Sequence, residues 1–257
     1  MDLELTDKVV LVTGGSDGLG RALCARLVDE GARVAFCGRD PGRLAATAEA
    51  LRAAGGDVLE VVADVTSPSD LAAFVGSAVE HFGAIDGVVN NAGRSAAGPV
   101  ADSTDQVWEE DLELKLMAAV RLTRLALPHL RTPASLVNVL AIAAKAPGAG
   151  TTPTSVSRAA GLALTKALSK ELGPSGVRVN AVLIGLVESG QWERRAADAG
   201  RAPADFYAEM GASAGIPLGR VGRADEFADL AAYLLSARSS YVSGTGINLD
   251  GGLSPAP

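Results

Sequence analysis

Short apolar runs alternate with segments of helical periodicity along almost the whole chain. Runs such as Val9–Val12 are continuously apolar and end in turn residues, which is typical of buried parallel strands. The segment Gly20–Glu30 places its leucines at helical spacing and stops at Gly31, which predicts an amphipathic helix. Because parallel strands joined by helices need right-handed crossovers, we expect an α/β fold with a doubly wound parallel sheet of about seven strands and helices on both faces.

The same patterns divide the chain into expected elements. The predicted strands are Val9–Val12, Arg33–Cys37, Val58–Val62, Ile85–Val89, Ser135–Val139, Val177–Val182 and Gly246–Leu249. The predicted helices are Gly20–Glu30, Pro41–Ala54, Pro68–Phe82, Thr104–Leu130, Thr154–Leu172 and Ala224–Leu235. The segment Glu188–Ala214 is polar, alanine-rich and irregular, so we expect an insertion that covers one end of the sheet and forms much of a substrate pocket. With no repeat and no linker, residues 1–257 are expected to form one domain.

Composition excludes several classes of protein. A chain with 48% apolar and 21% charged residues is not intrinsically disordered. The apolar run Ala134–Ala144 is too short to span a bilayer and is followed by Lys145. The first residues lack the basic and apolar regions of a secretory signal, and a net charge of −7 argues against a nucleic-acid partner. We therefore expect a cytoplasmic protein with neither a membrane nor a nucleic-acid partner.

The cysteines and histidines predict structural roles. Cys24 and Cys37 are too few for a disulfide framework, so reduced side chains in the core are expected. His81 and His129 fall at helix ends away from the carboxyl ends of the strands. No cluster of His and Cys has the spacing of metal ligands, so no metal site is expected.

A glycine-rich segment, Thr13–Gly20, follows the first predicted strand and opens the first predicted helix. Glycines at such a turn allow the backbone to approach a ligand closely, and the helix N-terminus offers free N–H groups to a pyrophosphate. The motif alone also fits a structural turn. Its place between the first strand and the first helix favours a dinucleotide site.

Five motifs follow one another in an order that spans nearly the whole chain. They are T-G-x-x-x-G-x-G at Thr13, Gly14, Gly18 and Gly20, Asp64-Val65, Asn90-Asn91-Ala92-Gly93, Val177-Arg178-Val179-Asn180 and Asp250-Gly251-Gly252. In these residues the chain resembles the short-chain dehydrogenase/reductase family. The resemblance implies a Rossmann-type fold, a nicotinamide cofactor, a small-molecule substrate and a homo-oligomer, either a tetramer or a dimer.

The resemblance also implies which residues bind the cofactor. They are Gly14, Ser16, Asp17, Gly18, Leu19, Gly20, Arg39, Asp64, Val65, Asn91, Ala92, Gly93, Arg158, Val187 and Ser189. Family members that prefer NAD place an acidic residue at the end of the second strand, where this chain has Gly38 followed by Arg39. An arginine fork matches a 2′-phosphate, so we predict NADP(H) rather than NAD(H). Two points oppose this prediction: Arg39 also fits a solvated surface residue, and Asp17 stands where NADPH-binding members often carry a base.

The positions of the family's four catalytic residues are all substituted. Asparagine, serine, tyrosine and lysine are replaced by Lys115, Ala141, Thr154 and Arg158, in that order. A threonine hydroxyl is far less acidic than a phenol, and an arginine stays protonated but can still hold the nicotinamide ribose.

Lys115 is the one titratable group left at these four positions, and burial beside Arg158 should lower its pKa. We predict Lys115, Thr154 and Arg158 as the catalytic residues, with Lys115 as the acid. The alternative to this catalytic role is that Lys115 is a surface residue or forms an ion pair with Glu113 or Asp111.

These substitutions restrict the reaction. We predict an NADP(H)-dependent oxidoreductase that transfers hydride to or from a small organic C=N or activated C=O group. An iminium accepts hydride without a protein acid, which favours an imine, but Lys115 and Arg158 would repel its positive charge. Either a neutral Lys115 or an acid such as Glu188 or Glu193 would have to offset that repulsion. Two alternatives stay open: a catalytically silent cofactor-binding protein that acts as a sensor or partner subunit, and a non-redox lyase or isomerase.

Overall fold

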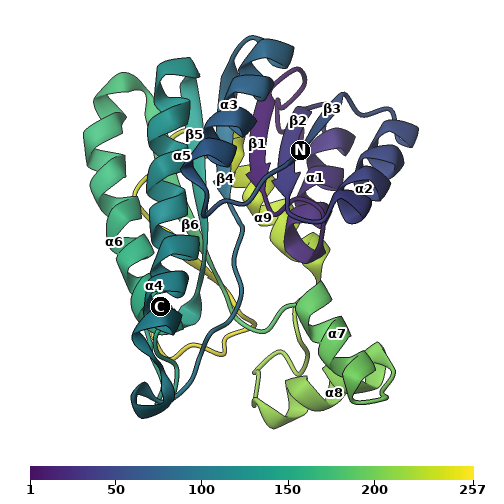
Figure 1. The fold of residues 1–257 in the computed structure, drawn as a ribbon, viewed down its shortest axis with the longest axis vertical. Coiled ribbons are helices and arrows are strands. Elements are labelled where there is room, and N and C mark those ends of the chain that lie inside the picture. The colour runs from purple at the N-terminus through teal and green to yellow at the C-terminus, as the bar shows by residue number, and fades with distance from the viewer.

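Seven parallel strands form the centre of the computed structural model, which describes residues 1–257 (Figure 1). Their order across the sheet is β3-β2-β1-β4-β5-β6-β7. The strands are β1 (Val9–Thr13), β2 (Arg33–Gly38), β3 (Val58–Val62), β4 (Ile85–Asn90), β5 (Leu130–Ala141), β6 (Val177–Ile184) and β7 (Gly246–Leu249). The order reverses between β1 and β4, and ligands of such sheets bind at the carboxyl ends of the strands beside this switch point. The predicted Rossmann-type α/β fold is therefore confirmed.

Helices cover both faces of the sheet because side chains of each central strand alternate between two apolar clusters. Val10 and Val12 of β1 belong to one cluster, and Val9 and Leu11 belong to the other. The first face is covered by α1 (Gly18–Asp29), α2 (Pro41–Ala53) and α9 (Ala224–Leu235). The second face is covered by α3 (Pro68–Phe82), α5 (Ala118–Ala126) and α6 (Thr154–Leu172).

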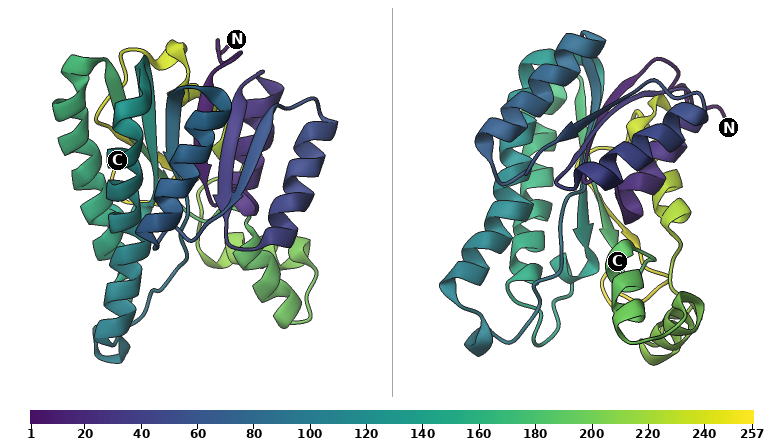
Figure 2. Two further views of the ribbon diagram at one scale, coloured as in Figure 1. Left: turned by 45° about the horizontal axis from the view of Figure 1, so that its top comes forward. Right: turned by 45° about the vertical axis from the view of Figure 1, so that its right-hand side comes forward.

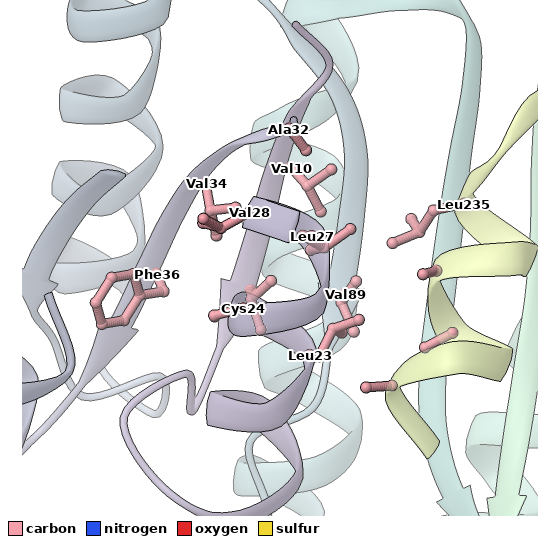
Figure 3. Close-up of a cluster of buried hydrophobic side chains, with 14 of the residues drawn as sticks. Val10, Leu23, Cys24, Leu27, Val28, Ala32, Val34, Phe36, Val89 and Leu235 are labelled. Carbon is pink, nitrogen blue, oxygen red and sulfur yellow. The ribbon is translucent and has the colours of Figure 1, made fainter. Parts of the chain in front are cut away.

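The cluster on the first face fixes the start of α1 relative to the strands. Figure 3 shows Leu23, Cys24 and Leu27 of α1 beside Leu235 of α9 on this face of the sheet. Cys24 and Cys37 are both buried and unpaired, and burial raises the pKa of each thiol. The predicted core role of the two cysteines is confirmed.

The segment predicted as one helix over Thr104–Leu130 is interrupted. It consists of α4 (Asp105–Leu112), a π-helical turn η2 (Glu113–Met117) and α5, and a short 3₁₀ turn then leads into the strand at Leu130. Inclusion of Leu130 in the helix was therefore wrong, because β5 begins there and is longer than predicted. Lys115 lies within the π turn, and such turns redirect side chains relative to an unbroken α-helix.

The segment Glu188–Ala214 was predicted to be irregular, which is wrong, because it contains two helices. They are α7 (Gly190–Asp198) and α8 (Pro203–Ser213), which Figures 1 and 2 show as a unit projecting beyond the sheet near α1 and α2. The hydroxyl of Tyr207 in α8 lies 3.2 Å from the backbone N of Ser189 and 3.3 Å from its carbonyl oxygen, which ties α8 to the start of α7. None of the helices is both long and apolar enough to cross a membrane.

Candidate active site

The glycine-rich loop has the backbone shape that its sequence predicts. Gly14 has φ of +67° and Gly18 has φ of +46°, conformations that residues with a side chain rarely adopt. A Cβ on Gly20 would lie 2.1 Å from the carbonyl oxygen of Gly14, so only glycine allows this crossing of loop and helix. The first turn of α1 leaves backbone N–H groups without intrahelical partners, and Asp17 caps only Gly18, at 2.8 Å. Loop and helix terminus together fit a pyrophosphate.

Asn91 fastens this loop from the neighbouring strand end. Its side-chain Nδ2 donates to the carbonyl oxygens of Thr13 at 2.8 Å and Gly14 at 3.2 Å. The Thr13 hydroxyl in turn accepts from the backbone N–H groups of Asn91 and Ala92, each at 3.0 Å. The amide of Asn91 is therefore used within the protein, and its geometry supports a role in holding the loop rather than in contacting a ligand through its side chain.

The end of β2 brings together the residues predicted to select the cofactor. Arg39 is 73% exposed and lies 3.8 Å from the carboxylate of Asp64, at the end of β3. A Cβ on Gly38 would lie 2.7 Å from the hydroxyl of Ser16, so the absence of a side chain there lets the phosphate loop approach β2. Val65, by contrast, is buried in the apolar cluster of the second face.

Asp17 is surrounded by two arginines that the sequence did not point to. Its Oδ2 lies 2.8 Å from Arg194 of α7 and 3.4 Å from Arg43 of α2. A Cβ on Gly190 would lie 2.2 Å from Asp17, so α7 begins directly against the phosphate loop. Arg43 is also paired with Asp40, at 3.0 Å. The negative charge of Asp17 is therefore paired with arginines, which weakens the objection to a 2′-phosphate at this corner.

Two further residues predicted to bind the cofactor, Val187 and Ser189, lie where β6 leads into α7. Val187 is buried, and the Cα and Cβ of Ser189 lie within about 3.5 Å of a Cβ position built on Gly18. Gln191 at the start of α7 accepts a 3.4 Å hydrogen bond from the backbone N of Ser95, in the loop after β4. The start of α7 thus spans from the phosphate loop to the loop that carries Ala96.

Thr154 begins α6 and is half-buried. Its Oγ1 accepts two hydrogen bonds, from the backbone N–H of Ala96 and from Nζ of Lys115, each at 2.9 Å. Because a hydroxyl oxygen has two lone pairs, both acceptor positions are occupied, and no acceptor for the hydroxyl proton lies within the protein. The single proton of Thr154 is free to be donated to another molecule.

Lys115 lies behind Thr154 and does not face solvent. Its side chain is 0% exposed and forms an ion pair with Asp111, one helical turn earlier, whose side chain is 1% exposed. Asp111 also accepts a 2.6 Å hydrogen bond from the hydroxyl of Ser157 in α6. The alternative of an ion pair with Asp111 is therefore confirmed and the surface location is wrong. Lys115 contacts Thr154 on one side and lines a small cavity on another.

The pKa of Lys115 is lowered to about 8. Burial is the largest cause, Asp111 opposes it, and the positive charges of Arg158 and Arg94 add to the lowering. The predicted direction of the pKa change is confirmed, although burial outweighs Arg158 as its cause. No ion pair joins Lys115 to Glu188 or Glu193, and Asp111 is its counter-charge.

Arg158 occupies the floor of the site on the next turn of α6. One terminal nitrogen donates to the carbonyl oxygen of Val139 at 2.7 Å, and another lies 2.7 Å from where a Cβ of Gly93 would stand. Burial lowers its pKa to about 10, so it remains charged at neutral pH. Its Nε is buried and has no hydrogen-bond partner, which leaves a donor for a ribose hydroxyl.

The structure therefore brings the three predicted catalytic residues together at the carboxyl ends of β4 and β5. A cavity of about 20 Å³ lies between Lys115 and Arg158 and is also lined by Asn90 and Asn138. Asp111 and Ser157 were missed as site residues. The spacing of Asp111 and Lys115 by four residues signalled an ion pair, but nothing in the sequence signalled that Ser157 would meet it.

Comparison with known proteins gives one consistent family. A family model described as "Enoyl-(Acyl carrier protein) reductase" matches residues 14–254. A protein of Streptomyces virginiae, assigned as ketoacyl reductase of the monensin polyketide synthase, is 36% identical over 258 residues, covering 97% of this chain and 98% of the relative.

Two solved structures superpose closely. An NADPH-bound short-chain oxidoreductase of Pseudomonas aeruginosa PAO1, described as containing an atypical catalytic center, is 38% identical with a TM-score of 0.92, covering 98% of this chain and 100% of the other. L-Sorbose reductase of Gluconobacter frateurii, in complex with NADPH and L-sorbose, is 30% identical with a TM-score of 0.93, covering 100% of both chains. With its motifs, its sheet order and these relatives, the chain belongs to the short-chain dehydrogenase/reductase family.

Proposed function

We propose that this protein is an NADP(H)-dependent reductase that converts a carbonyl group of a small organic molecule to an alcohol, with Thr154 as the residue that contacts the carbonyl oxygen. The observation that carries the proposal is the pair of hydrogen bonds accepted by Thr154, from Ala96 and Lys115. They leave its hydroxyl proton as a fixed donor. A donor aimed at the oxygen of a carbonyl stabilises the negative charge that develops there when hydride adds to the carbon.

The cofactor follows from both the residues and the relatives. The glycine loop fits a pyrophosphate, Arg39 and Arg43 provide guanidinium groups for a 2′-phosphate, and the unpartnered Nε of Arg158 suits a ribose hydroxyl. The Pseudomonas and Gluconobacter structures were both obtained with NADPH. When bound, the reduced nicotinamide supplies the hydride.

Charge at the site favours a carbonyl over an imine. Lys115 and Arg158 bring two positive charges and Asp111 brings one negative charge. This excess of positive charge attracts a developing oxyanion and repels an iminium. While Lys115 is charged, the buried carboxylate offsets only one of the two cations, which supports the expected repulsion of an iminium. A neutral Lys115 would remove that repulsion.

Proton transfer can pass along the same contacts. As the alkoxide forms, the Thr154 hydroxyl gives its proton to the substrate oxygen, and the Lys115 ammonium gives a proton to Oγ1 of Thr154 across the 2.9 Å contact. The lysine is left neutral, the threonine is restored and the alcohol is complete. The cavity of about 20 Å³ beside Lys115 has room for one water molecule, through which the lysine can regain its proton.

Two measurements test the proposal. The first is fluorescence titration of the purified protein with NADPH and with NADH, which should give much tighter binding of NADPH. The second is a panel of ketones and matched cyclic imines of the same ring size, followed by NADPH absorbance, in which turnover should be confined to the ketones. Turnover of the imines alone would overturn the carbonyl assignment. Binding of NADPH without turnover of either class would instead point to a cofactor-binding protein without catalysis.

We retain the prediction of a homo-oligomer, a tetramer or a dimer, which rests on family membership. Light scattering of the purified chain of 26.0 kDa measures this directly, and a mass equal to one chain would refute it.

A further inference from the structure

The buried carboxylate of Asp111 stands at the inner end of a chain of polar contacts. One oxygen, Oδ1, is paired with the ammonium of Lys115, and the other, Oδ2, accepts from Ser157 at 2.6 Å. Lys115 then donates to Thr154 at 2.9 Å. Asp111 and Lys115 are both almost fully buried, so neither charge is screened by water.

The direction of the hydrogen bonds in this chain depends on the charge of Lys115. An ammonium has three N–H donors and no acceptor, so next to Thr154 it can only donate. A neutral amine has a lone pair and can accept. The hydroxyl of Thr154 would then donate its proton inward, to Lys115, and would no longer offer it to a substrate.

The surroundings of Lys115 are divided between groups that favour the charged and the neutral form. Burial, Arg158 of α6 and Arg94 of the loop after β4 favour the neutral amine and lower the pKa. Asp111 of α4 is the group that opposes them. Arg94 is itself paired with Glu110 at 2.8 Å, and Glu113 is paired with Arg121, so neither of these carboxylates replaces Asp111.

We propose that Asp111 is a positioning residue that keeps the Lys115 ammonium charged and thereby holds the Thr154 hydroxyl proton pointing toward the substrate. The inference rests on the proposed function for the identity of the substrate. The charge state of Lys115 does not depend on that function and can be measured without a substrate. Ser157 fixes the second oxygen of the carboxylate, so that Oδ1 stays aligned with Nζ.

The experiment uses lysine labelled with ¹³C at the ε carbon, because the chain has only five lysines and their signals can be separated. The Lys115 signal is identified as the one lost in Lys115→Met. Its titration midpoint is then measured in the full-length wild type, Asp111→Asn and Asp111→Glu. We expect the midpoint to fall in Asp111→Asn by about one pH unit or more, because an opposite charge in contact is removed. In Asp111→Glu, which keeps the negative charge, we expect the midpoint to return most of the way to the wild-type value.

The matched control is Ser157→Ala, which removes a partner of Asp111 but keeps the carboxylate charge. Its midpoint should fall by much less than that of Asp111→Asn, because the negative charge beside Lys115 stays, whereas a shift as large as in Asp111→Asn would attribute the effect to packing and overturn the proposal. An unchanged midpoint in a folded Asp111→Asn would also overturn it.

A kinetic readout accompanies the titration. If ketone reduction is found, the alkaline limb of its pH profile should move to lower pH in Asp111→Asn. If no reduction is found in the wild type, the proposed function fails while the NMR titration still decides the role of Asp111.

Discussion

The Nζ of Lys115 and the Oγ1 of Thr154 lie 2.9 Å apart, although 39 positions separate the two residues along the chain. The contact joins the π turn between α4 and α5 to the first residue of α6. From the family resemblance we expect an amide side chain at the position of Lys115 and a phenol at that of Thr154. In place of a tyrosine phenol, the pair offers the weakly acidic hydroxyl of Thr154, with the ammonium of Lys115 donating to it.

Replacement of Thr154 by valine should abolish most of the catalysis. Valine has nearly the same shape but no hydroxyl, so the oxygen of the substrate loses its donor. We expect kcat to fall about 10²- to 10³-fold, as for removal of one donor from an oxyanion site, with little change in NADPH affinity. Thr154→Ser should keep activity. The matched control is Thr151→Val, because the hydroxyl of Thr151 donates to the carbonyl oxygen of Gly148 within the protein. If Thr151→Val lowered kcat as much as Thr154→Val, the assignment of Thr154 would be refuted.

The rate of reduction should depend on pH through Lys115. The pKa of Lys115 is lowered to about 8, so the donating ammonium is present below that pH and is lost as the pH rises through it. We therefore expect kcat/KM for reduction to be constant from neutral pH up to the midpoint and to decline above it. A profile that rises across this range would contradict donation by the ammonium. The measurement is initial NADPH oxidation in buffers of constant ionic strength.

Replacement of Arg39 by alanine should weaken NADPH selectively. A hydrogen bond to a charged group is worth about 1.5–3 kcal/mol, so the Kd for NADPH should rise roughly ten- to a hundredfold while that for NADH stays nearly constant. Arg21, an exposed arginine of α1, gives the control Arg21→Ala, which should leave both constants unchanged. Equal weakening of NADPH and NADH by Arg39→Ala would argue against a contact with the 2′-phosphate.

Replacement of Gly20 by alanine should distort the phosphate loop. The added Cβ would meet the carbonyl oxygen of Gly14 at 2.1 Å, and backbone must move to relieve this contact. We expect a lower Tm together with a loss of NADPH binding. The control is Gly76→Ala in the middle of α3, where nothing lies within 4 Å, and where alanine should stabilise the helix by about 0.4–1 kcal/mol. Normal NADPH affinity in Gly20→Ala would refute this account of the loop.

Asp86 should contribute to stability at neutral pH. Burial raises its pKa, but hydrogen bonds from Arg131 and from the Val9 N–H, with the charge of Lys8, outweigh burial and lower it. The stabilisation is therefore present above the pKa of the unfolded chain and is lost as the pH falls through the folded value. We expect Asp86→Asn to lower the free energy of unfolding by about 1–3 kcal/mol at pH 7 and by much less in acid. Asp229→Asn, which removes an exposed ion pair with Arg26, should change it by under about 1 kcal/mol.

The sequence alone was sufficient to predict the parallel sheet and the position of the cofactor loop. Apolar strands and amphipathic helices are local patterns, because a buried strand must be apolar along its length and a helix on its inner face. The loop glycines are equally local, since the conformations of Gly14 and Gly18 require residues without side chains. Family resemblance then located Lys115, Thr154 and Arg158 as the substituted positions.

Only the tertiary structure decided how those three residues are arranged. The sequence predicted Lys115 as the acid on an unbroken helix, whereas the π turn and the packing of α4 against α6 enclose it with Asp111 and Ser157 behind Thr154. The two arginines that pair with Asp17 likewise come from α2 and α7, far from it in the chain. Burial and charge pairing depend on segments distant in the sequence, and the protonation of a group depends on both, so no local pattern could have determined which of these side chains is enclosed and which is half-exposed.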